Sequence, residues 1–141
     1  MSKVVFNEET LRYVRLFQDI TGCMTVDCVE SEDKIVFVVK KGEGARAIGR
    51  KGEMAARLRK LLKRDVQVVE YSEIPEEFVA NIFRSYDVKK VEIEDREGIV
   101  HATVTVEATM KGRAIGREGK NLRLARQLIS RHHPIQSVNV A

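Results

Sequence analysis

Two nearly identical stretches of this chain combine glycine with basic side chains in a way suited to holding a phosphate group. Residues 46–52 read Arg-Ala-Ile-Gly-Arg-Lys-Gly, and residues 113–119 read Arg-Ala-Ile-Gly-Arg-Glu-Gly, 67 positions later. Because glycine has no Cβ, main-chain N–H groups beside it can come close to a ligand. If a helix follows, its first N–H groups have no partner inside the helix and favour an anion. The two stretches therefore predict a pair of sites for a phosphate backbone.

The basic residues of the chain gather around these two stretches. Residues 45–64 and 111–132 contain eight and seven of the 25 lysines and arginines, and their only acids are Glu53 and Glu118. The remainder has 10 basic and 19 acidic residues, although the whole chain has a formal charge of +4. Positive charge concentrated on an otherwise acidic protein is typical of a surface that binds a polyanion. A solvated helix face without a partner would explain either segment alone, but it explains the repeated bias less well.

Repetition at a fixed long spacing indicates a chain built from two copies of one unit. We expect one domain at residues 1–71 and a second at residues 72–141. The join at residues 71–75 has neither the length nor the Gly/Ser composition of a flexible linker. We therefore expect the two units to keep a fixed relative orientation and to offer one continuous basic path.

The hydrophobic pattern predicts one order of elements in both halves: helix, strand, strand, short helix, Gly-x-x-Gly loop, helix, strand. A first helix is expected after the N-cap Asn7 and is expected to end at Gly22. The remaining elements of the first half are expected at residues 25–29, 35–39, 45–48, 53–63 and 66–71. Those of the second half are expected from residue 74, and at 88–94, 99–107, 111–115, 120–131 and 135–140, with a turn at 95–98.

Apolar residues at helical spacing predict which side of each helix is buried. The residues expected in the core are Leu11, Val14, Phe17 and Ile20; Met54, Leu58, Leu61 and Leu62; Phe78, Ile82 and Phe83; and Leu122, Ala125, Leu128 and Ile129. Cys23 and Cys28 are expected on opposite faces of a strand, as small buried hydrophobic residues without a disulfide or a shared metal.

The longer pattern resembles the KH-domain family. It consists of Ala-Ile-Gly-Arg-x-Gly between two helices, a basic amphipathic second helix and flanking strands, all in two copies. In that family the Gly-x-x-Gly loop clamps about four nucleotides of single-stranded nucleic acid. A helix before the strands, and a strand after the helix pair, resemble the prokaryotic (type II) arrangement. The resemblance implies an α+β fold of two tandem type II KH domains, each with a small three-stranded sheet packed by helices.

Two KH units joined this closely in a chain of 141 residues resemble the short archaeal form of the NusA family of transcription termination and antitermination factors. This resemblance implies a cytoplasmic monomer that binds single-stranded RNA in nascent transcripts during elongation or termination. It also implies RNA polymerase or other transcription proteins as candidate partners. Two alternatives remain open: a KH protein of the ribosome or of RNA processing, and a protein-interaction scaffold with degenerate KH units.

The resemblance and the charge pattern place the RNA-binding residues on the two loops and the basic side chains near them. In the first unit these are Arg46, Ile48, Gly49, Arg50, Lys51, Gly52, Arg57 and Lys60. In the second unit they are Arg113, Ile115, Gly116, Arg117, Glu118, Gly119 and Lys120. Ile48 and Ile115 would line the groove for the bases or pack in the core. The Glu118 carboxylate should repel phosphate, so we expect the second unit to bind RNA more weakly.

Other classes of function fit the sequence less well. A P-loop would need glycine at position 114 and Ser or Thr at position 121, where the chain has Ala114 and Asn121. The histidines and the acidic pairs suggest no active site, so we expect no catalysis, no cofactor and no metal. An RNA-recognition motif would need stacking aromatic residues, which make up only 6% of the chain. No apolar run approaches the roughly 20 residues that cross a membrane, so we expect no membrane partner.

Overall fold

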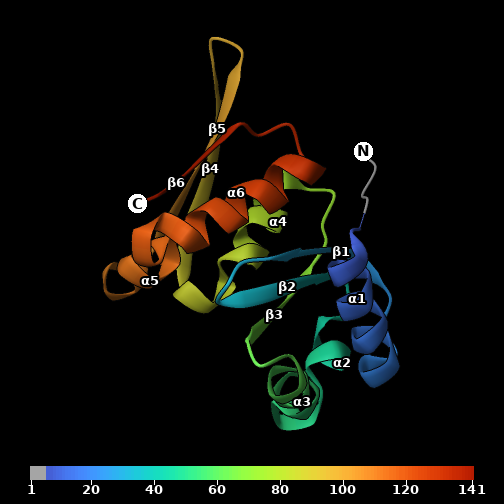
Figure 1. Cartoon of the computed structure of the whole chain (residues 1–141). Coiled ribbons are helices and arrows are strands. Elements are labelled where there is room, and N and C mark those ends of the chain that lie inside the picture. Colours follow the sequence, from blue (N-terminus) through green and yellow to red (C-terminus); the bar gives the residue numbers. More distant parts are fainter. Residues whose placement is uncertain (1–5) are drawn as a thin grey trace. The chain divides into compact units, whose positions relative to one another are not determined.

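The computed structural model describes residues 6–141, which form two compact units, residues 6–72 and Glu73–Ala141 (Figure 1). Each unit contains a three-stranded sheet packed by helices, so the fold is α+β as predicted. The units meet one residue beyond the expected boundary. The assignment of residues 1–71 and 72–141 as two separate KH domains stays a prediction.

The first unit has the element order that the sequence predicts. Its elements are α1 (Glu8–Thr21), β1 (Thr25–Glu30), β2 (Lys34–Val39), α2 (Gly44–Ile48), the 3-10 turn η1 (Arg50–Gly52), α3 (Glu53–Leu62) and β3 (Asp65–Glu70). Strand β2 pairs antiparallel with β1 and parallel with β3. Parallel neighbours cannot be joined by a tight turn and need a crossover connection. The segment α2–η1–α3, which contains the first Gly-x-x-Gly, is that crossover.

The second unit repeats this topology. Its elements are α4 (Pro75–Ile82), η2 (Arg84–Tyr86), β4 (Val88–Arg96), β5 (Ile99–Val106), η3 (Ala108–Met110), α5 (Lys111–Ile115), η4 (Arg117–Gly119), α6 (Lys120–His132) and β6 (Ser137–Val140). Strand β5 pairs antiparallel with β4 and parallel with β6. The second Gly-x-x-Gly therefore also lies in the crossover between two parallel strands.

The limits of α1 are those that the sequence predicts. The Asn7 side chain accepts a hydrogen bond of 2.8 Å from the N–H of Thr10, and the Thr10 hydroxyl accepts one of 3.0 Å from the N–H of Asn7. This reciprocal capping satisfies two amides that the helix leaves without partners. At the other end Gly22 has φ of 72°, a left-handed conformation that favours glycine, and its N–H donates to the Gln18 carbonyl.

The core of the first unit is built around the stacked rings of Phe17 and Phe37, whose centroids lie 4.3 Å apart. Its other buried members are Cys23, Cys28, Ile35, Val39, Ala47, Leu58 and Val66. Both cysteines are buried and free, as expected. Both belong to the same core cluster. Cys23 precedes β1, so the strand alternation on which the expected opposite faces rested does not apply to it.

Two of the predicted helix faces are rotated relative to the structure. Leu61 is 53% exposed, because α3 packs through Ala55 and Leu58. In α6, Ala125, Leu128 and Ile129 are buried as predicted. Leu124 is buried as well, whereas Leu122 is only partly buried. Leu122 lies six positions before Leu128, about a third of a turn away around the helix, so it sits at the edge of the buried stripe. In α1, Leu11 is 40% exposed, so it is not part of the core.

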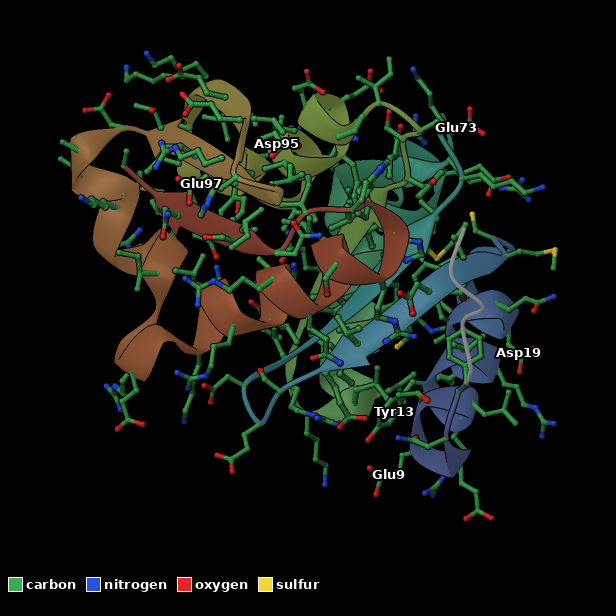
Figure 2. The ribbon with its side chains drawn as sticks, turned by 90° about the horizontal axis from the view of Figure 1, so that it is seen from above. Glu9, Tyr13, Asp19, Glu73, Asp95 and Glu97 are labelled. Atoms are coloured by element: carbon green, nitrogen blue, oxygen red, sulfur yellow. The ribbon has the colours of Figure 1, made fainter. Side chains whose placement is uncertain are left out.

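The β4–β5 hairpin is longer, and its turn shorter, than predicted. Strand β4 continues through Asp95 and Arg96, so only Glu97 and Gly98 form the turn. Both have positive φ, 55° and 85°, which matches the two-residue turns that fit the twist of antiparallel strands. Side chains of Asp95 and Glu97 lie at this end of the hairpin (Figure 2). The last strand begins at Ser137 instead of residue 135, although Ile135 is buried.

Among residues 6–141 no helix has the length and hydrophobicity that a membrane crossing requires. Within the same residues no group of three or more His, Cys, Asp or Glu side chains is placed to hold a metal ion.

Lys63 offers a test of how α3 ends. It is exposed and holds a left-handed conformation with φ of 55° and ψ of 33°. A residue with a Cβ destabilises the folded state by about 1–2 kcal/mol in this conformation. Glycine removes that strain but loses more backbone entropy on folding, which offsets part of the stabilisation. We expect Lys63→Gly to raise the free energy of unfolding by about 0.5–1 kcal/mol, measured by urea denaturation. The control Ala56→Gly, inside the same helix, should lower it by about 1 kcal/mol. Destabilisation by both variants would contradict this account of the helix end.

Candidate nucleic-acid interface

The two Gly-x-x-Gly loops have the same backbone conformation. Their first glycines, Gly49 and Gly116, have φ/ψ of 84°/171° and 80°/166°. Lys51 and Glu118, the third residues of the loops, are left-handed at 54°/27° and 58°/24°. The last glycines follow at 73°/16° for Gly52 and 72°/13° for Gly119. The repeat in the sequence is therefore a repeat of one local structure.

The first glycine of each loop is required by packing inside the protein. A Cβ on Gly49 would lie 2.9 Å from the main-chain nitrogen of Met54 and 2.5 Å from its Cγ. A Cβ on Gly116 would lie 2.8 Å from the main-chain nitrogen of Asn121. Their φ/ψ region is also essentially restricted to glycine. The missing side chain thus lets the loop fold tightly against the first turn of the following helix.

The last glycine of each loop faces open space. A Cβ on Gly52 would meet nothing within 4 Å, and one on Gly119 would meet only the Arg123 guanidinium, at 3.4 Å. Their left-handed φ favours glycine, but no neighbouring backbone excludes a side chain. A bare main chain that is open on its outer side is what a phosphate backbone needs for close approach.

The prediction that these loops offer bare amides is wrong for the glycines. Gly49 and Gly52 donate their N–H groups to Ala45 and Gly49 carbonyls, at 2.9 and 3.1 Å, and Gly116 and Gly119 repeat both bonds. The amides of Glu53 and Lys120 likewise donate back into the 3-10 turns. The tight turn uses these donors to close on itself. The positive side chains must therefore contribute more of the attraction for an anion than the sequence suggested.

The charged side chains inside both loops are exposed. Arg50, Lys51, Arg117 and Glu118 all face solvent, and so do Arg57 and Lys60 on α3 and Arg113 on α5. Among the described residues, no ion pair or side-chain hydrogen bond involves the side chains of these seven residues. Lys120 opens α6 and is partly buried. The structure thus leaves most of the predicted cations available to a ligand.

Other basic residues of the same segments are used to hold the fold. Arg64 donates to Glu30 and to the Ser31 carbonyl, both at 2.9 Å, and to the hydroxyl of Tyr13. Partial burial opposes its charge, but the contacts with Glu30 and Tyr13 outweigh it, so the pKa of Arg64 is raised. Arg59 pairs with Asp65 at 3.0 Å. Sequence alone does not separate these structural cations from the available ones.

Arg46, Ile48 and Ile115 lie next to the loops but differ in their surroundings. The Arg46 guanidinium lies beside Gly22, with Nη2 3.1 Å from the position of a Cβ there. The carbonyl end of α1 favours a positive charge. Ile48 is 40% exposed and Ile115 is half-buried, whereas the alanines before them, Ala47 and Ala114, are fully buried. Core packing is therefore the wrong alternative for Ile48, and its side chain is open to a ligand.

Different side chains hold the two helix pairs in place. In the first unit the Glu70 carboxylate accepts hydrogen bonds from the N–H groups of Gly42 and Gly44, at 2.9 and 3.0 Å, just before α2. In the second unit Asn121 Nδ2 donates to the Ala114 carbonyl at 2.7 Å, and Arg123 Nη1 donates to the Glu118 carbonyl at 2.6 Å. Arg123 is not among the residues of the second loop that the sequence predicts. An alignment of the two copies would have indicated it, because the second copy has an arginine there where the first copy has Ala56.

Comparison with known proteins places both units in one family. Residues 75–140 match the model of the NusA-like second KH domain, and residues 16–75 match the model of the KH domain. The chain is 34% identical over 139 residues to a probable transcription termination protein NusA of Halococcus morrhuae, covering 99% of each chain. It is 30% identical over 140 residues to the protein of that name in Thermoplasma acidophilum, covering 99% of this chain and 97% of the other.

A solved structure extends the likeness to three dimensions. The crystal structure of APE1850 is similar to this chain with a TM-score of 0.75 and 34% sequence identity. The match covers 96% of this chain and all of that one.

The two glycines of a loop should respond differently to substitution. Gly49→Ala brings a Cβ within 2.9 Å of the Met54 main chain and forces a glycine-only conformation, so we expect a loss of at least about 2 kcal/mol of unfolding free energy. Gly52→Ala has room for its methyl group and should lose only about 1 kcal/mol. Chemical denaturation followed by circular dichroism measures both. Equal losses would mean that the close contact at Gly49 does not constrain the loop.

Proposed function

Since this chain belongs to the NusA-like family of tandem KH-domain proteins, we propose that it binds single-stranded RNA through its two Gly-x-x-Gly loops. The RNA-binding residues we propose are the fifteen of the sequence analysis. They lie on or beside α2, η1 and α3 in the first unit, and α5, η4 and α6 in the second. The protein acts as a monomer in the cytoplasm and carries out no catalysis.

One observation supports this proposal above the others. Two loops of the same conformation each end in a left-handed glycine with no backbone close to its outer side, beside exposed arginines. A phosphodiester needs both close access to the main chain and positive charge within reach. A loop that served only as a structural turn would need its first glycine but would not need the exposed Arg50 and Lys51.

The charge distribution indicates how the RNA is held. Each phosphate that an arginine or lysine neutralises releases condensed counterions, so binding weakens as salt rises. Bases, in turn, would lie against the exposed Ile48 and the half-buried Ile115 beside the loops. Affinity would thus come mainly from the backbone contacts, and base preference from the apolar contacts.

The names of the relatives extend this proposal to transcription. Several are called probable transcription termination protein NusA, and we propose that this chain likewise acts on nascent transcripts during elongation or termination. RNA polymerase or another transcription protein is its proposed protein partner. A role in the ribosome or in RNA processing would use the same loops. A scaffold with degenerate KH units would bind a protein partner without needing the loop cations.

Charge reversal in the first loop tests the RNA-binding proposal. We expect Arg50→Asp combined with Lys51→Asp to weaken binding of a single-stranded RNA of about 12 nucleotides at least tenfold, because two phosphate contacts become repulsive. Fluorescence anisotropy with a labelled oligonucleotide measures the affinity. Circular dichroism should be unchanged, since neither side chain has a hydrogen bond or ion pair within residues 6–141.

The matched control places the same change of charge elsewhere. Arg12 and Arg15 are exposed on α1, so Arg12→Asp with Arg15→Asp alters the net charge equally but leaves the loop intact. This variant should bind RNA within about threefold of the wild type. Equal loss in both double variants would show that net charge alone attracts RNA and would reject the loop as the binding site.

Salt dependence provides a second test with a separate readout. The logarithm of the affinity should fall linearly with the logarithm of the salt concentration, by about 0.7 for each phosphate contact with single-stranded RNA. Removing Arg50 and Lys51 should therefore reduce the slope by roughly 1.4, determined by titrations at several salt concentrations. An unchanged slope would indicate that these side chains contact no phosphate.

A further inference from the structure

The two loops share a backbone but differ in how positive charge is supplied. The first contains Arg50 and Lys51, whereas the second contains Arg117 and Glu118. Two further charge differences lie at the start of the following helix, where the first copy has Glu53 and Ala56 and the second has Lys120 and Arg123. The copy that has lost a loop cation therefore has two additional ones at the start of the following helix, and of these Arg123 is the exposed one.

Arg123 reaches the loop in the structure. It lies in the first turns of α6, four residues after the N-cap Gly119, so its side chain is on the side of the helix where Gly119 lies. Its Nη1 donates to the Glu118 main-chain carbonyl at 2.6 Å and lies 3.4 Å from the position that a Cβ of Gly119 would occupy. The guanidinium is thus next to Gly119. At Gly52, the corresponding glycine of the first loop, a Cβ would meet nothing within 4 Å.

The positive charge of Arg123 is not consumed by this contact. A guanidinium has five N–H donors, and the bond to the Glu118 carbonyl is the only side-chain hydrogen bond of Arg123 in residues 6–141. In that part of the chain no ion pair joins it to the Glu118 carboxylate or any other acid. The side chain is also exposed. The remaining donors are available to an anion outside the loop.

We propose that Arg123 is a phosphate-binding residue of the second loop and replaces the cation that Lys51 supplies in the first. This inference rests on the proposed RNA-binding function and assigns a residue outside the fifteen. The phosphate would lie over Gly119, between the guanidinium groups of Arg117 and Arg123, with Glu118 turned to solvent. The repulsion expected from Glu118 is then offset by a cation on the neighbouring helix.

The two loops consequently hold phosphate in different ways. Within the described part of the chain the Lys51 ammonium has no hydrogen bond or ion pair, whereas the Arg123 guanidinium is anchored by the carbonyl of Glu118. A planar guanidinium can give two parallel hydrogen bonds to a phosphate, and lysine cannot. The second loop should therefore depend on the geometry of its cation and not only on its charge.

Substitution of Arg123 tests this assignment in the full-length protein. We expect Arg123→Gln to weaken binding of a labelled single-stranded RNA of about 12 nucleotides roughly fivefold or more, because one phosphate contact is lost. Arg123→Lys should recover only part of the affinity. The matched control is Arg126→Gln. Arg126 is exposed on the same helix and also donates to a main-chain carbonyl, that of Val138 at 3.0 Å. Its substitution should change affinity less than twofold.

A graft into the first unit provides a test that does not depend on the stability of the second. Lys51→Glu copies the loop of the second unit and should weaken binding. Adding Ala56→Arg places an arginine at the position matching Arg123 and should restore most of the lost affinity. Position 56 is exposed, so the new side chain displaces nothing from the core.

The outcomes separate this inference from the function on which it rests. If wild-type protein binds no single-stranded RNA, the proposed function fails and the assignment fails with it. If wild-type protein binds and the Arg50/Lys51 reversal weakens binding, but Arg123→Gln does not, only the assignment of Arg123 is overturned. The assignment is also overturned if Arg123→Gln and Arg123→Lys lose affinity equally with an equal fall in melting temperature, because Arg123 would then act only by holding the loop.

Discussion

The parallel pairing of β2 with β3, and of β5 with β6, is the constraint from which the rest of the structure follows. A parallel pair needs a crossover, and in a unit of about 70 residues little chain is left to build one. Both units solve this with two short helices folded against each other. The fold is possible because Gly49 and Gly116 bring their main chains within contact of the next helix. At the same turn, the last glycine of each loop has no backbone close to its outer side.

Within each loop the two glycines have separate physical roles. The first packs closely against the helix that follows, and the second is left-handed with no backbone close to its outer side. The amides of both donate inside the turn, which makes the loop rigid but leaves fewer main-chain donors for an anion. The exposed arginines and lysines then supply the positive charge around the loops. A rigid turn with mobile charges around it can hold a repeating polyanion without selecting one base.

The two copies reach the same loop conformation through different side-chain contacts. Glu70 holds the segment before α2 in the first unit, whereas Asn121 and Arg123 hold the loop of the second. At the first, third and fourth loop positions the corresponding dihedrals nevertheless differ by no more than 5°. The backbone conformation is therefore set by the glycines and the crossover. The surrounding side chains can therefore differ between the two units, and the charge near each loop differs as a result.

The sequence by itself determined what depends on neighbours along the chain. The caps of α1 at Asn7 and Gly22, the element order and the duplicated loop follow from local turn chemistry and from periodicity, and the structure confirms them. Local pattern could not decide which side of a helix faces the core, so Leu122 and Leu61 were wrongly predicted to be buried. Nor could it show that Arg64 is held by Glu30, 34 positions away, while Arg50 remains available. Only the tertiary structure decides these points, because a side chain's partners depend on which distant segments pack around it.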